Sequence, residues 1–145
     1  MKRKHFFAAI DEKRITSAIA AAEKRTSGRI RVFVSHHRYS DVMPAARRHF
    51  RHLGMDKTHH RNAVLIFVAP ESQTFALLGD VAIHEKVGDE FWRVLRDQMV
   101  PEFKAGRYTE GIVHAIGRAG ELLAAHFPAA AAHHSNEPPN AVGKI

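Results

Sequence analysis

The chain has 145 residues, of which 45% are hydrophobic and 26% are charged, as is usual for one globular domain. It contains no cysteine, which excludes disulfides, thiolate catalysis and zinc sites built on cysteine. The formal net charge of +7 at pH 7 permits nonspecific attraction to nucleic acid or anionic lipid but demonstrates neither.

The N-terminal segment resembles an export signal only in its basic start, Lys2-Arg3-Lys4. The apolar run that follows, Phe6–Ile10, is shorter than the roughly 7–15 residues of a signal peptide. No window approaches the roughly 18 apolar residues of a membrane helix. We therefore expect no export signal and no membrane span, and the cytoplasm is the expected location.

The first half of the chain alternates helix and strand. Apolar residues at helical spacing predict a helix over 10–26 with Asp11 as its N-cap. Residues 29–35 alternate in polarity and predict a strand. A second helix is predicted over 42–53, with Pro44 in its first turn.

The centre of the chain predicts a strand hairpin. The continuous apolar run Ala63–Ala69 is typical of a central strand buried on both faces. A turn over Pro70–Gln73 leads into a strand at Thr74–Leu78, and so short a connection requires an antiparallel pair. A helix separates the first two strands, which predicts a parallel pair with a right-handed crossover.

Helices predominate in the last third. Residues 81–88 fit a loop, a short turn or the start of a helix. A helix over 89–100 is expected to end at Pro101, because proline removes a helical hydrogen bond, and 101–108 can add a further turn. A final helix is predicted from a Thr109 cap to Phe127.

The predicted order of elements is α-β-α-β-β-α-α. Helices on both faces of a small mixed sheet define an α/β fold, a three-layer α/β/α sandwich. We assign this domain to residues 1–128. Residues 129–145 lack periodicity and are rich in alanine, histidine and proline, which predicts a disordered tail.

Several short stretches of the sequence resemble one family in their order and spacing. They are Thr26–Val32, Leu53–Met55 with Thr58, Arg61–Ile66, Gly79–Asp80, Ile83–Gly88 with Phe91–Trp92, and Phe103–Lys104 with Tyr108, Glu110, Gly111 and Ile112. Together they resemble the TPM domain family, in particular its short, soluble bacterial members, over about residues 10–128.

The resemblance implies an α/β/α sandwich but no single activity. One plant thylakoid member is described as an acid phosphatase in photosystem repair. Some bacterial members bind calcium or other divalent ions in loops, and others are accessory or membrane-linked proteins. The resemblance assigns no catalytic residue to this chain.

The predicted topology gathers polar residues at one end of the sheet. Residues before the central strand must meet residues after its antiparallel partner. The binding candidates at this end are Thr58, Arg61, Asn62, Gly79, Asp80 and His84. The end is richer in carboxylate and imidazole than the opposite end of the sheet.

The same cluster contains candidate metal ligands. Asp80, Glu85 and Asp89 could offer carboxylate oxygens to a hard cation such as Ca²⁺ or Mg²⁺, with His84 as a borderline ligand. Such an ion could position a phosphate and activate water. Structural roles are the commoner explanation: Asp80 can bond a turn, Asp89 can cap a helix and Glu85 can face solvent.

Three functions remain open, because the sequence does not reveal a reaction. The first is a binding or accessory domain that recognises a protein partner, including a membrane-associated one, through a polar cleft. The second is a metal-assisted phosphatase acting on phosphomonoesters. The third, ranked last, is nucleic-acid binding through the basic residues around the second helix, since stacking aromatics are not visible. Those basic residues are Arg47, Arg48, Arg51, Lys57 and Arg61, and a solvated helix face is their commoner explanation.

Overall fold

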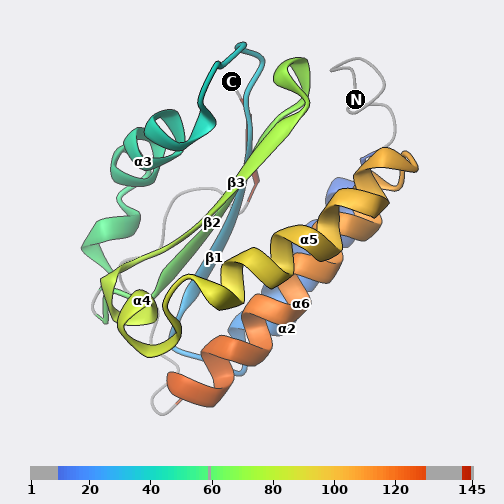
Figure 1. The fold of residues 1–145 in the computed structure, drawn as a ribbon. Helices are drawn as coiled ribbons and strands as arrows, with labels where there is room; N and C mark the ends of the chain where they lie inside the picture. The colour runs from blue at the N-terminus through green and yellow to red at the C-terminus, as the bar shows by residue number, and fades with distance from the viewer. Residues whose placement is uncertain (1–9, 59, 130–141, 145) are drawn as a thin grey trace.

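The computed structural model describes residues 10–58, 60–129 and 142–144. Figure 1 shows a sheet with α3 on one face and α2, α5 and α6 on the other, which confirms the predicted α/β/α layers. The helices and strands are α2 (Glu12–Glu23), β1 (Arg29–Val34), α3 (Val42–His52), β2 (Ala63–Ala69), β3 (Thr74–Gly79), α4 (Val81–Val87), α5 (Glu90–Lys104), α6 (Tyr108–His126) and β4 (Val142–Lys144).

The sheet has the order β3-β2-β1-β4. β1 and β2 run parallel, with Arg29 opposite Ala63. β2 and β3 run antiparallel, with Val64 opposite Gly79. The parallel pair confirms the prediction from the helix between the two strands, and the antiparallel pair confirms the prediction from the short turn. Among the strands of the described residues, β3 therefore lies at one edge of the sheet, where β2 alone pairs with it.

Two hydrophobic cores lie on opposite faces of the sheet. Every residue of β2 is buried, as its unbroken apolar sequence predicts. Because side chains alternate along a strand, Val64 and Ile66 face α2, α5 and α6, while Leu65 and Phe67 face α3.

The segment after β3 is a helix in its own right. Asp80 caps α4 by accepting a hydrogen bond from the Val81 amide at 2.8 Å. This settles the ambiguous segment 81–88. Over the described residues there is thus one more α-helix than in the predicted order of elements.

Two predicted helix boundaries are wrong. Pro101 does not end α5 but lies inside it, and the Ala105 amide still donates to the Pro101 carbonyl at 3.0 Å. Burial of Met99 and Phe103 on the same helix face outweighs the lost hydrogen bond. Thr109 does not cap α6, because this helix already begins at Tyr108. The Thr109 hydroxyl instead accepts a hydrogen bond from the Asp11 amide at 3.0 Å.

The C-terminal prediction falls mainly on residues outside the described part, namely 130–141 and 145. The prediction of a disordered tail over 129–145 does not describe Val142–Lys144, which form β4 beside Val32–Val34 of β1. Among the residues that the structure describes, no helix is both long and apolar enough to cross a bilayer.

Candidate functional site

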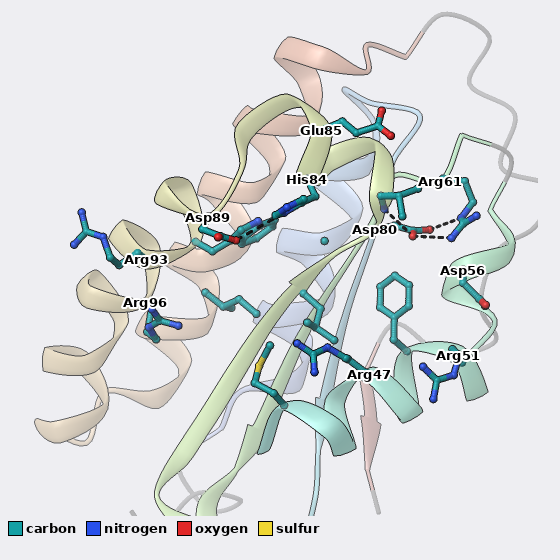
Figure 2. A pocket seen from close by; sticks show the side chains of 17 residues that line it. Arg47, Arg51, Asp56, Arg61, Asp80, His84, Glu85, Asp89, Arg93 and Arg96 are labelled. Carbon is teal, nitrogen blue, oxygen red and sulfur yellow. Dashed lines mark hydrogen bonds and ion pairs between the residues drawn. The ribbon is translucent and has the colours of Figure 1, made fainter. Parts of the chain in front are cut away.

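A groove of about 830 Å³ opens beside edge strand β3, between α3 on one side and α4 with α5 on the other. Figure 2 shows Arg47 and Arg51 on the α3 side, and Arg93 and Arg96 on the α5 side. This volume lies within the range of small-ligand sites in proteins. The groove is therefore the candidate site.

The floor of the groove is apolar. It combines side chains from three elements: Met43, Phe50, Leu77, Leu78 and Trp92. Leu77 and Trp92 belong to the core under α5, whereas Phe50 and Leu78 belong to the core under α3. The groove thus lies where the two cores meet at the sheet edge, and a ligand in it would contact apolar surface from both.

Gly79 has a steric role in this floor. A Cβ atom at this position would lie 2.6 Å from Cζ2 of Trp92 and 3.2 Å from Cγ2 of Ile83. Only glycine lets the indole ring lie so close to the end of β3. Gly79 was selected from the sequence as a binding candidate, and the structure places it in the groove lining beneath Trp92.

Arg61 and Asp80 form a fork-shaped ion pair at one end of the groove. Nε of Arg61 donates to Oδ2 of Asp80 at 2.8 Å, and Nη2 donates to Oδ1 at 3.0 Å. The Asp80 side chain is 4% exposed, whereas that of Arg61 is 47% exposed. Hydrogen bonding to Asp80, and then its negative charge, raise the pKa of Arg61.

The loop backbone also holds this end of the groove. The Arg61 carbonyl accepts from the Ala82 amide at 3.2 Å, and the Ala63 carbonyl accepts from the Asp80 amide at 3.0 Å. Arg61 has a φ of +52°, in the left-handed region that non-glycine residues seldom occupy. The predicted meeting of the loop before β2 with the end of β3 is therefore present in the structure.

The predicted metal ligands do not fit a metal centre. Both carboxylate oxygens of Asp80 accept hydrogen bonds from Arg61. Glu85 points away from Asp89 in Figure 2, and both side chains are exposed. His84 Nδ1 lies 3.8 Å from Asp89 Oδ1, a weak surface pair. Within the described ranges, no three histidine or acidic side chains are arranged to hold an ion.

Two further binding candidates lie outside the groove. Asn62 is 1% exposed, and its amide donates to Oγ of Ser27 at 3.1 Å, beside the start of β1. Thr58 is 6% exposed. Oδ1 of Asn62 and Oγ1 of Thr58 are buried and have no hydrogen-bond partner among the described residues.

Comparison with known proteins assigns the chain to one family. Residues 1–122 match the TPM domain. The chain belongs to the TPM domain family. A similar solved structure is the NMR structure of the BA42 protein from the psychrophilic bacterium Bizionia argentinensis, at 38% identity and a TM-score of 0.82. The similarity covers 94% of this chain and 95% of that one. No curated protein matches the sequence.

The arginines of this TPM domain differ in their partners. Arg93 pairs along α5 with Glu90 at 2.5 Å and with Asp97 at 3.5 Å. Arg47, Arg51 and Arg96 make no ion pair or side-chain hydrogen bond with any residue that the structure describes. Their guanidinium groups are therefore available to an anionic ligand.

Only part of this arrangement is visible in the sequence. Arg47 and Arg51 were predicted to lie on a solvated helix face, and Arg93 and Arg96 were not among the predicted site residues. Their spacing of three residues places these two arginines on one face of α5, which was the available signal. Spacing within one helix cannot show that another helix lies opposite across a groove.

Proposed function

We propose that this TPM domain is a binding domain that holds an acidic segment of a protein partner in the groove beside β3. The observation that carries the proposal is the set of three arginines without carboxylate partners in the described residues, placed over an apolar floor. Guanidinium groups bind carboxylates through paired, charge-assisted hydrogen bonds. Apolar surface beneath them would add affinity through burial.

Charge in the groove favours a protein over a nucleic acid. Asp56 and Glu85 also line it and would repel a continuous phosphate backbone. Trp92 is 9% exposed and cannot present its ring as a platform for a base. A peptide can vary its charge residue by residue, so it can place carboxylates near the arginines and apolar groups over the floor.

The phosphatase hypothesis lacks comparable support. Its proposed ligand Asp80 is committed to Arg61, and no observation in the groove supplies a nucleophile in its place. A protein partner, including one associated with a membrane, requires no such group. Binding therefore ranks above metal-assisted hydrolysis.

The test uses a defined acidic probe, an acetylated and amidated octapeptide of alternating glutamate and valine. We expect it to shift the amide resonances of groove residues in the ¹⁵N-labelled domain, and a lysine–valine octapeptide to leave them unchanged. Arg47→Glu should weaken binding by roughly 10- to 100-fold, because one charge-assisted hydrogen bond contributes roughly 1.5–3 kcal/mol.

The matched control is Arg48→Glu, which makes the same charge change on the same helix outside the groove. It should weaken binding far less than Arg47→Glu. Equal weakening by both variants, or equal binding of the lysine peptide, would contradict the proposal. A separate titration of the unliganded domain with Ca²⁺ and Mg²⁺ tests the metal hypothesis. Its readout is the shift of the amide resonances near Asp80, Glu85 and Asp89.

A further inference from the structure

Edge strand β3 offers unpaired backbone groups to the groove. In an antiparallel ladder, the amide and carbonyl of alternate residues point to the same side of the strand. The Asp80 amide donates to the Ala63 carbonyl, which fixes the alternation. Ala76 and Leu78 therefore bond to β2, and the amides and carbonyls of Phe75, Leu77 and Gly79 point to the open edge.

These outward groups have no hydrogen-bond partner among the residues that the structure describes. Leu77 and Gly79 also line the groove. The outward edge of β3 is thus part of the same surface as the arginines. An extended peptide placed there could pair its backbone with β3 and project its side chains toward α3 and α5.

The sequence of β3 lacks the usual protection of an edge strand. Natural edge strands commonly carry a lysine, a proline or a bulge that prevents pairing with another chain. Thr74–Gly79 contains no charged residue and no proline, and its register with β2 is unbroken. The helices on either side leave this edge open to the groove, so it stays available to an added strand.

We infer that the occupant is an extended acidic peptide of a partner protein, which adds to β3 as a fifth strand of the sheet. This inference rests on the proposed function and specifies its binding mode. Charge complementarity decides the occupant. A second copy pairing through its own β3 would bring Thr74–Gly79, which has no acidic side chain for Arg47, Arg51 or Arg96.

Hydrogen exchange provides the first readout, with the glutamate–valine octapeptide as the probe. In the free domain, the Phe75, Leu77 and Gly79 amides should exchange rapidly, while those of Ala76 and Leu78 are already protected. When the concentration of free peptide is about nine times Kd, about nine-tenths of the domain is bound. The three outward amides should then slow by about tenfold, because only the unbound fraction exchanges.

Backbone methylation of the peptide provides the second readout. Valine amides lie along one edge of the extended peptide and glutamate amides along the other. We compare peptides N-methylated at the two central valines or at the two central glutamates. Strand addition predicts that one of these peptides loses binding while the other retains it, because only one peptide edge faces β3.

The outcomes separate the binding mode from the proposed function. Strand addition is overturned if the peptide shifts the amide resonances of groove residues in a way that depends on Arg47, while the outward amides stay unprotected and both methylated peptides bind equally. The binding function would still stand in that case. Absence of groove shifts overturns both. Outward amides whose protection rises with protein concentration, without peptide, identify a second copy as the occupant and overturn the acidic peptide.

Discussion

The two faces of the sheet are covered differently. In the described part of the chain, the long helices α2, α5 and α6 pack on one face, and their core includes Ile15, Met99 and Ile116 at 0% exposure. One helix, α3, packs on the other face. Its smaller core includes a titratable ring, because His49 stacks on Phe33 with ring centroids 4.8 Å apart.

The difference shows where this fold places its open surface. Neighbouring helices cover the three-helix face along its length. On the one-helix face, α3 packs on Ala76 and Leu78 of β3 but leaves the backbone edge of this strand and the gap toward α5 open, and the groove forms there. Stability should therefore depend mainly on the first face and ligand binding on the second, and four predictions examine that division.

The largest effect is expected in the three-helix core. Ile116→Ala should lower the free energy of unfolding by about 2–5 kcal/mol, because it removes a buried side chain and leaves a cavity. Met43→Ala, at a partly buried position in the floor of the groove, should lower the free energy of unfolding clearly less. Urea denaturation measures both variants, and equal losses would break the comparison.

A smaller effect is expected where the faces meet. Gly79→Ala should cost about 1–3 kcal/mol by overpacking, because the new Cβ would lie 2.6 Å from Trp92. Gly117→Ala is the matched control: its Cβ meets no atom within 4 Å, and alanine favours a helix. Thermal unfolding should show the control at or above the wild-type midpoint. A neutral Gly79→Ala would remove the steric explanation for glycine there.

The next effect depends on pH and belongs to the one-helix face. Burial, followed by the charge of Arg48, lowers the pKa of His49 below its ordinary 6.5. The unfolded chain therefore takes up the proton first as the pH falls. This contribution to stability is complete above pH 6.5 and declines as the pH falls through the folded pKa.

Urea midpoints at pH 7.5 and pH 5 measure that decline. His49→Phe keeps a ring against Phe33 and Phe67 but cannot be protonated, so its stability should fall less between the two pH values. His52→Phe, three residues along the same helix, is the control. If His49→Phe and the wild type lose equal stability, another group causes the acid sensitivity.

The smallest effect on stability is expected at the groove rim. Arg96→Ala should leave the unfolding midpoint unchanged, because this side chain is exposed and has no ion pair in the described part of the chain. Its binding of the acidic octapeptide should nevertheless weaken measurably in the NMR titration. A large loss of stability would place Arg96 in the structural framework instead.

Much of the architecture followed from local pattern. The apolar run Ala63–Ala69 predicted a strand buried on both faces, and the short turn after it predicted an antiparallel partner. Asp11 was predicted as an N-cap, and its side chain accepts from the Arg14 amide at 3.0 Å. Such features depend on residues close in sequence, where backbone geometry restricts the alternatives.

Other features depended on contacts between distant segments. Pro101 stays helical because Met99 and Phe103 are buried around it, and tertiary burial outweighs one lost hydrogen bond. Asp80 was identified as a site residue, but its pairing with Arg61 required the coordinates.

By itself, then, the sequence determined the fold class, the order of strands and helices apart from α4 and β4, and the meeting of the loop before β2 with the end of β3. Only the tertiary structure decided that Arg47 and Arg96 lie on opposite walls of one groove. The physical reason is that an exposed arginine has the same local pattern whether it faces open solvent or another helix. Its surroundings are set by packing between elements far apart in the chain.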